Sequence, residues 1–367
     1  MCTSLIYKDA AGKPYFGRTL ELTVSLPYQV AHIPAGFKFS SKTNTNAALD
    51  YEAQHAFVAI TMTDRLPTAD APVGIGDLKV LEGLNDKGLT FSLLSYPAAA
   101  GQQTAVEATK AVLSASDLGS WVLSQFDSVA AVKTALEQQP VLLQPLAILG
   151  GVVSPFHYVA HDQSGAALVI EFDNGQMRLY DNPVGVMTNG PRFDWHLTNL
   201  NNYTFLSNVD KSTATFGSYN ASQPDSGIAT QGLPASNTSV GRFVRAVYYA
   251  HFTEKAATPD LAILTVGHIM NNFDRARGVS IDYPESETAN LEVKGLQADT
   301  STPYATEFTS WTSLSDLDRK LFHVRGYGSL NYAAIDLGAL ASNTAPSFVS
   351  LQDLNGTTAD ATAALKA

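Results

Sequence analysis

The residue with the clearest chemical potential is Cys2, the one cysteine among 367 residues. Removal of Met1, which a small second residue favours, leaves Cys2 with both a thiol and a free α-amine. An α-amine has an ordinary pKa of about 8, so it can accept a proton near neutral pH without a histidine. A deprotonated thiol is a strong nucleophile. The sequence therefore predicts a cysteine nucleophile whose own amine is its catalytic base once Met1 is removed.

Other chemical signals in the chain are weaker. His157 and His161 lie in a predicted strand at a spacing too long for two ligands of one metal ion, and no His-Glu-x-x-His motif accompanies them. Residues 74–76 lack the third glycine of a nucleotide-binding loop, and no Gly-x-Ser-x-Gly motif indicates a serine hydrolase. We therefore expect neither a metal nor a cofactor. A Cys–His protease stays an alternative, because it requires only a histidine near Cys2.

The composition of the chain disfavours two classes of binding partner, nucleic acids and membranes. The net charge of −11 and the lack of any Lys/Arg-rich run argue against nucleic acid and against an anionic membrane surface. The longest apolar run, residues 141–156, is interrupted by Gln, Pro and Gly, so we expect no membrane insertion. No basic and then apolar leader precedes Cys2. We expect a periplasmic protein if a signal peptide has been removed before Cys2, and a cytoplasmic one otherwise.

Strand and helix signals alternate around these residues. Strands are predicted at residues 3–7, 15–22, 56–63, 79–82, 89–94, 157–161, 167–172, 306–311, 320–324 and 330–335. Helices are predicted at residues 116–126, 129–137, 242–250 and 259–273. Residues 199–240 are rich in Asn, Ser, Thr and Gly and are interpreted as long loops. A strand that begins at residue 3 would hold Cys2 in place, where most chain ends fray.

This order of elements indicates the fold class. Strand blocks that alternate with helix pairs are typical of an α+β protein, with antiparallel sheets and helices on their outer faces. No break in composition and no internal repeat divides the chain. We therefore expect a single domain over residues 1–367, with residues 338–367 as a C-terminal extension.

Short segments along the chain resemble a known family. They are residues 1–5, 16–21, 83–89, 184–189 with 193–196, and 241–245. In this order and spacing they are similar to the choloylglycine hydrolase and penicillin V acylase family of N-terminal-nucleophile hydrolases, over about residues 2–337. The resemblance implies a four-layer αββα sandwich of two antiparallel sheets, with Cys2 at a strand start between them. It also implies that His196, within the fourth segment, is structural.

The resemblance assigns roles to two residues near Cys2. Arg18 matches the family arginine beside the nucleophile, and a guanidinium there favours the thiolate. Glu21 matches the position that hydrogen-bonds the N-terminal amine, which in the family is usually Asp. The extra methylene of Glu21 moves its carboxylate by roughly 1.5 Å.

Three further residues are placed around the substrate carbonyl by the same resemblance. Asn189 matches the family asparagine that donates to the developing oxyanion. Arg242 matches the arginine that opens the helix after the long loop and reaches the reaction centre. Ser95 stands where bile salt hydrolases mostly have Asn and some penicillin V acylases have Tyr. Because serine is shorter than either, a backbone N–H near Ser95 is expected to supply the second oxyanion donor.

The substrate expectation follows from the resemblance and from these departures. The chain is most like the Gram-negative penicillin V acylase branch, which implies a small-molecule acyl amide, penicillin V first, with N-acyl homoserine lactones as a further substrate. A conjugated bile salt hydrolase is the alternative within the family. A noncatalytic binding protein on the same fold is the alternative of another class, and it would retain Met1. The family also implies a homotetramer built through residues 199–240.

Overall fold

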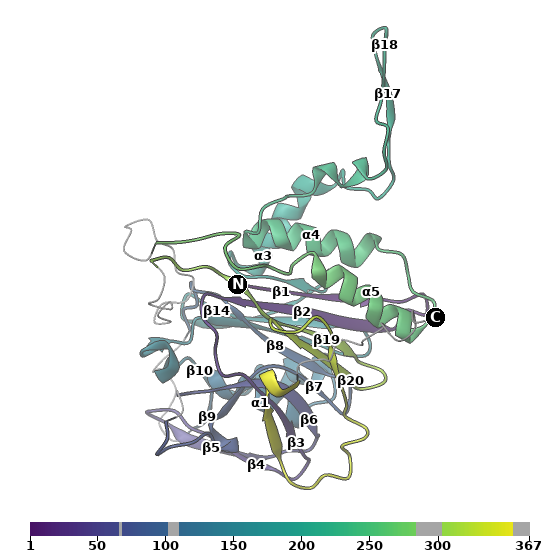
Figure 1. The fold of residues 1–367 in the computed structure, drawn as a ribbon. Helices are drawn as coiled ribbons and strands as arrows, with labels where there is room; N and C mark the ends of the chain where they lie inside the picture. The colour runs from purple at the N-terminus through teal and green to yellow at the C-terminus, as the bar shows by residue number, and fades with distance from the viewer. Residues whose placement is uncertain (66–67, 102–109, 284–302, 355–367) are drawn as a thin grey trace.

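The computed structural model describes residues 1–367 except 66–67, 102–109, 284–302 and 355–367. Two antiparallel sheets form the centre of the molecule, and helices cover the outer face of each sheet (Figure 1). The core lies between and behind these sheets, in one cluster of buried side chains that includes Cys2. The expected α+β class and αββα sandwich are therefore confirmed.

The first sheet carries the start of the chain. Its six strands, in sheet order, are β16 (Val186–Met187), β1 (Cys2–Lys8), β2 (Pro14–Leu22), β19 (Phe308–Asp316), β20 (Leu321–Gly326) and β21 (Ala333–Asp336). Strands β1 and β2 are buried along nearly their whole length, although they contain the polar residues Thr3, Ser4, Arg18, Thr19 and Glu21. Because β1 is paired on both sides, the chain terminus is held inside the sheet.

Two helices cover the outer face of this sheet. They are α4 (Ser239–Phe252) and α5 (Pro259–Asn271), and α3 (Phe193–Leu200) packs beside α4. Thr238 and Thr258 cap α4 and α5 by accepting hydrogen bonds from backbone N–H groups in the first turns. Helix α5 approaches β2 closely at Gly17, where a Cβ atom would lie 2.7 Å from Val266 Cγ1. A glycine is required there, since any side chain would push the helix off the sheet.

The second sheet has eight strands and carries α1 (Leu118–Gln125) and α2 (Val129–Leu136) on its outer face. In sheet order they are β15 (Gln176–Asp181), β14 (Ala167–Asp173), β13 (Phe156–His161), β8 (Thr90–Ser95), β7 (Leu78–Asn85), β6 (Phe57–Thr63), β3 (Gln29–Ile33) and β22 (Ser347–Ser350). A smaller sheet adjoins it through β10 (Val141–Leu142), β9 (Ala111–Ser114), β5 (Ala47–Glu52) and β4 (Lys38–Ser41).

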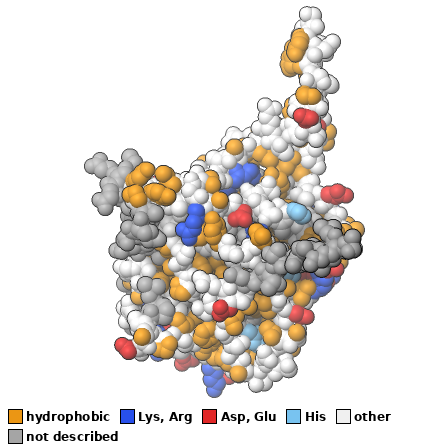
Figure 2. Space-filling view, viewed as in Figure 1, with side chains coloured by type: hydrophobic (Ala, Val, Ile, Leu, Met, Phe, Trp, Pro, Cys, Tyr) orange, Lys and Arg blue, Asp and Glu red, His pale blue; other side chains and the backbone are white. Residues whose placement is uncertain are grey.

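The interpretation of residues 199–240 as loops was wrong in part. This segment contains a hairpin of β17 (Thr213–Phe216) and β18 (Tyr219–Ser222) that projects from the helical layer (Figure 1). The pattern hid it because every residue of β17 is exposed, so no alternation of buried and exposed positions marks the strand. Phe216 and Tyr219 are each 69% exposed, and Figure 2 shows apolar side chains on this projection.

Other strands were missed for related reasons. Strands β4 and β5 are mostly exposed, and β22 pairs with β3 beyond the last strand that we predicted. The predicted helices all form, with ends displaced by up to three residues. Among the described residues, no helix is long and apolar enough to cross a membrane.

Candidate active site

Cys2 begins β1 and is 3% exposed. Its backbone is paired with Leu20 on β2, and the preceding carbonyl of Met1 accepts a hydrogen bond from Glu21 N at 2.7 Å. The sulfur atom therefore has a defined position at a strand end, although it lies only two residues from the terminus.

Arg18 lies next to this sulfur. It projects from β2, is completely buried, and places Nη2 3.6 Å from Cys2 Sγ. The guanidinium also donates to the carbonyls of Leu81 and Leu93 on the second sheet, and it lies 4.9 Å from the ring centre of Trp311. A buried cation in this position stabilises the thiolate.

Glu82 on β7 is the ion-pair partner of Arg18. Its Oε2 atom lies 3.1 Å from Arg18 Nη1 and accepts a hydrogen bond from Ser92, and both charged side chains are fully buried. Burial raises the pKa of Glu82 to about 7, against the opposing effect of Arg18. Glu82 is not among the site residues predicted from the sequence. The available signal is a carboxylate at the end of the predicted strand 79–82, directly before a segment that resembles the family.

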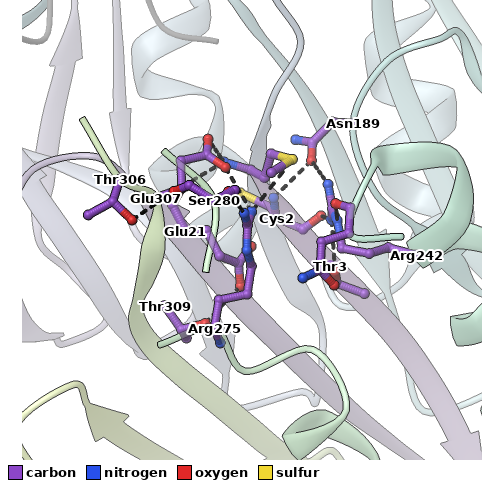
Figure 3. A network of polar contacts seen from close by, with 12 residues as sticks. Cys2, Thr3, Glu21, Asn189, Arg242, Arg275, Ser280, Thr306, Glu307 and Thr309 are labelled. Atoms are coloured by element: carbon purple, nitrogen blue, oxygen red, sulfur yellow. Dashed lines mark hydrogen bonds and ion pairs between the residues drawn. The ribbon is translucent and has the colours of Figure 1, made fainter. Parts of the chain in front are cut away.

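Arg242 and Asn189 hold the backbone of Cys2 (Figure 3). Arg242 donates to the carbonyl of Cys2, to Thr3 Oγ1 at 2.8 Å and to Asn189 Oδ1 at 2.6 Å. Asn189 Oδ1 also accepts from Cys2 N at 2.9 Å, and its Nδ2 donates to the carbonyl of Ser95 at 2.7 Å. Because arginine can only donate, these contacts determine the orientation of the Asn189 amide.

The local sequence explains how the side chains of Arg242 and Asn189 are placed beside Cys2. Arg242 lies in the first turn of α4, which Thr238 caps. Gly241 permits the close approach of the preceding loop, because a Cβ atom would lie 2.7 Å from Ser236 O. Asn189 follows β16, and its backbone N donates to Ser239 Oγ at 2.9 Å. The start of α4 therefore positions both polar side chains.

Glu21 does not contact the nitrogen of Cys2 in this structure. The Cys2 nitrogen is a peptide N–H here, and it donates to Asn189. Glu21 Oε1 accepts from Thr309 Oγ1 at 3.2 Å, whereas the buried Oε2 has no hydrogen-bond partner within the described part of the chain. Burial raises the pKa of Glu21, while Arg242 and the N-terminal amine oppose this shift. The predicted contact with a free Cys2 amine stays a prediction.

Ser95 lies close to Cys2, and its predicted place beside the oxyanion stays a prediction. It ends β8, it lines the same pocket as Cys2, and its buried Oγ has no hydrogen-bond partner among the residues described. The next backbone N–H, that of Tyr96, already donates to Pro155 O at 2.7 Å. The expected backbone donor near Ser95 is therefore not Tyr96 N in this state.

Met1 occupies the space beside Cys2. Its ammonium group donates to Glu21 O at 2.5 Å and lies 3.3 Å from Glu307 Oε1. Glu307 in turn pairs with Arg275 at 2.8 Å (Figure 3). The unprocessed terminus is therefore held by charged partners directly at the candidate site.

An apolar pocket adjoins the sulfur. Besides Met1, Cys2, Glu21 and Ser95, its lining consists of apolar and aromatic side chains, namely Leu20, Leu22, Leu26, Tyr28, Met62, Leu81, Leu93, Leu149 and Phe156. With Met1 present, its volume is about 50 Å³, which accommodates only a few water molecules. The pocket is suited to an apolar acyl group, and loss of Met1 would enlarge it.

The histidines do not form a Cys–His pair. His157 and His196 contact the carbonyl oxygens of Thr188 and Asn189 through Nε2 at 3.0 and 2.9 Å, so they support the loop that carries Asn189. Among the hydrogen bonds of the described residues, none joins a histidine to Cys2. No group of three or more His, Cys, Asp or Glu side chains in the described ranges could hold a metal ion.

Comparison with known proteins agrees with this geometry. Residues 2–345 match the family described as linear amide C-N hydrolases, choloylglycine hydrolase family. The chain therefore belongs to the choloylglycine hydrolase family and is a hydrolase of non-peptide linear amide C–N bonds. It is 26% identical, over 92% of each chain, to the bile salt hydrolase/transferase of Clostridium perfringens (strain 13 / Type A).

Solved structures show the same fold. A mutant of the conjugated bile acid hydrolase from Clostridium perfringens has a TM-score of 0.78 and 22% identity, and the match covers 98% of this chain and 99% of that one. The penicillin V acylase of Agrobacterium tumefaciens has a TM-score of 0.72 and 20% identity, with 95% and 92% covered.

Proposed function

We propose that Cys2, after removal of Met1, is the nucleophile of this hydrolase and that its α-amine is the general base. The amine takes the thiol proton, and the thiolate attacks the amide carbonyl carbon. The amine then returns the proton to the leaving nitrogen as the C–N bond breaks, and water hydrolyses the thioester. The observation that carries this proposal is the buried Arg18 guanidinium 3.6 Å from Sγ at the second residue of the chain.

Asn189 is proposed to stabilise the oxyanion. Its Nδ2 carries two hydrogens, of which one is directed to Ser95 O. The second hydrogen is proposed to serve the tetrahedral intermediate, and Arg242 holds the amide in place through Oδ1. Ser95 Oγ, buried in the pocket without a partner among the described residues, is the candidate second donor.

Glu21 is proposed to hold the amine of processed Cys2. Its Oε2 is buried and has no hydrogen-bond partner in the described ranges, which is costly unless another state of the protein supplies one. The ammonium that forms on Cys2 during the reaction is such a donor. It also lowers the cost of ionising the Glu21 carboxyl.

Conjugated bile salts are the substrate class that the relatives favour. The Clostridium perfringens bile salt hydrolase/transferase matches over 92% of both chains, and the pocket beside Cys2 is apolar, as the acyl part of such a substrate requires. The original expectation, penicillin V first, therefore becomes the second candidate.

Penicillin V is kept as the second candidate because Ser95 departs from the asparagine expected of bile salt hydrolases. Ser95 also differs from the tyrosine of some penicillin V acylases, and the fold is shared with solved structures of both kinds of enzyme. N-acyl homoserine lactones remain a predicted further substrate, since they carry the same kind of linear amide on an apolar chain.

The decisive assay compares wild type with Cys2→Ala on glycocholate, penicillin V and a long-chain N-acyl homoserine lactone. Release of the free amine product from at least one of them by wild type, and from none by Cys2→Ala, is expected. Turnover by Cys2→Ala, or no turnover of any amide by protein that begins at Cys2, would refute the proposal.

Assembly and location are proposed separately. A homotetramer built through residues 199–240 is supported by the exposed apolar side chains of the β17–β18 hairpin. Deletion of residues 213–222 is expected to reduce the mass measured by light scattering. A periplasmic location stays a prediction, which N-terminal sequencing of protein from fractionated cells tests.

A further inference from the structure

A row of buried polar groups leads away from the nucleophile. Cys2 Sγ lies 3.6 Å from Arg18 Nη2, Arg18 Nη1 lies 3.1 Å from Glu82 Oε2, and Ser92 Oγ donates to the same carboxylate oxygen. The row begins on the first sheet and ends on the second, and all four residues are buried. Glu82 is bonded to Nη1 of Arg18, whereas the sulfur contacts Nη2. The proposed reaction does not use Glu82.

We infer that Glu82 is a positioning residue for the nucleophile: it holds the Arg18 guanidinium against Cys2 Sγ and offsets part of its charge. The inference concerns the thiol alone. It therefore holds or fails independently of which amide the protein hydrolyses, and of whether the Cys2 amine is the base.

The geometry gives Glu82 a role that the backbone cannot supply. Carbonyls of Leu81 and Leu93 each accept from one terminal nitrogen of Arg18, so they orient the guanidinium. They carry no net charge, however, and a buried guanidinium without an anion is strongly disfavoured. The thiolate and the Glu82 carboxylate are the two anionic groups that this one cation contacts. They therefore compete for it.

Few other titratable groups face this row. Three titratable groups belong to the row itself: Cys2 on β1, Arg18 on β2 and Glu82 on β7. A fourth is Tyr28, in the segment before β3, whose hydroxyl lies near Cys2 and Arg18. Burial raises the pKa of Tyr28, so its hydroxyl stays neutral. Ser92 on β8 and Trp311 on β19 add a hydroxyl and an aromatic face without a charge. Glu82 is thus the one carboxylate bonded to Arg18 within the described residues.

The competition makes a directional prediction for Glu82→Gln. The amide oxygen of glutamine can still accept from Arg18 and Ser92, so the position of the guanidinium is kept while the competing charge is removed. The thiolate is then the one anionic group in contact with the Arg18 guanidinium, so its ionised form is favoured more strongly. The pH profile of Cys2 alkylation by iodoacetamide is expected to move to lower pH, by about one unit for a charge at this range. Cys2 is the one cysteine, so the labelled mass reports it alone.

Two variants keep the test decisive. Asp316→Asn changes a buried carboxylate at the end of β19 that pairs with the partly exposed Arg319, whose Nε lies 2.6 Å from Asp316 Oδ2, and is expected to leave the profile unchanged. Ser92→Ala removes the hydroxyl that favours the ionised form of Glu82, and is expected to shift the profile in the same direction by less.

The pH profiles of Cys2 alkylation in these variants either support or overturn the role of Glu82. A shift to lower pH in Glu82→Gln that Asp316→Asn does not share supports the inference, even if no amide substrate is turned over. An unchanged profile, or a shift to higher pH, in both Glu82→Gln and Ser92→Ala overturns it. If Glu82→Gln does not fold, the Ser92→Ala profile decides alone.

Discussion

The two sides of Cys2 differ in how completely their polar groups are bonded. On the backbone side, Arg242 and Asn189 are buried and bonded to the nucleophile, to each other and to the surrounding loop. On the pocket side, Tyr28 Oη, Ser95 Oγ and Glu21 Oε2 are buried without a hydrogen-bond partner among the described residues.

The difference indicates that the polar groups on the backbone side already have their hydrogen-bond partners, whereas those on the pocket side are open to a further partner. A buried polar group without a partner costs about 1–3 kcal/mol, so a polar group left open in a pocket beside a reactive side chain is a candidate to be bonded in another state of the protein. Under the proposed function, that state is the processed terminus with a substrate bound. The bonded side would then hold Cys2 in advance, and the open side would be completed during the reaction.

The largest expected effect comes from breaking the buried ion pair. Arg18→Ala removes the cation that favours the ionised form of Glu82, so the buried carboxyl must either take up a proton or stay charged without a partner, and the free energy of unfolding is expected to fall by about 3–5 kcal/mol. It also removes the cation beside Sγ. Denaturant unfolding measures the first effect, and iodoacetamide labelling of Cys2 measures the second.

The double variant Arg18→Ala, Glu82→Gln distinguishes these effects. This variant is expected to regain much of the stability, because the buried Glu82 carboxyl that lacks a cation is replaced by a neutral amide. It is expected to regain none of the thiol reactivity, because the Arg18 cation is still absent. Recovery of both properties would show that Arg18 acts only through stability.

Asn189→Ala tests the bonded side. Loss of one oxyanion donor is expected to lower kcat by about 10²–10³-fold, measured on whichever amide the wild type hydrolyses. Asn85→Ala is the matched control, since Asn85 is a buried asparagine whose Nδ2 donates to the carbonyls of Leu123 and Phe126 away from Cys2. It should lose stability and keep kcat. Equal kcat losses in both variants would argue against the assigned role.

The pH dependence of stability reports the Glu82 carboxyl. Its pKa is about 7 in the folded protein, above the ordinary value near 4.3, so between these values the folded state keeps a proton that the unfolded state releases. Stability from this group is therefore lost as the pH rises towards 7. The free energy of unfolding of Glu82→Gln, minus that of wild type, is expected to increase by about 1–3 kcal/mol from pH 4.5 to pH 8. A constant difference in urea unfolding would contradict this.

The smallest effect is expected on the open side. Tyr28→Phe removes a hydroxyl that lies beside the Ser310 hydroxyl but makes no hydrogen bond of standard geometry within the described ranges, so the free energy of unfolding should stay within about 0.5 kcal/mol of wild type or rise. Thermal unfolding without substrate measures it. A loss above about 1.5 kcal/mol would mean that the hydroxyl is bonded, and that the contrast between the two sides is smaller than described.

Sequence reasoning predicted the parts of this site that depend on local pattern. Cys2 followed from its position, the β1–β2 pair from two strand-like segments around a turn, and α5 from its Thr258 cap. Arg18, Asn189 and Arg242 were named by resemblance, and the structure brings all three to Cys2.

The remaining features depend on contacts between distant segments. Glu82 meets Arg18 only because two sheets pack together, and a carboxylate in a strand pattern does not reveal such a partner. The partners of Glu21 were not predicted either. Thr309 reaches Glu21 through the long-range pairing of β2 with β19, and the Met1 terminus reaches the Glu21 carbonyl through the pairing of β1 with β2. The β17–β18 hairpin escaped because exposed strands carry no burial signal.

The central claim is that the free amine of Cys2 is the catalytic base, and the N-terminus tests it most directly. Two forms of the protein are to be prepared and verified by mass: one that begins at Cys2, and one in which an added residue keeps Cys2 in a peptide bond. Their rates are then compared on the same acyl amide at the same pH. We predict hydrolysis by the form that begins at Cys2 and none above background by the blocked form. Equal rates would contradict the account.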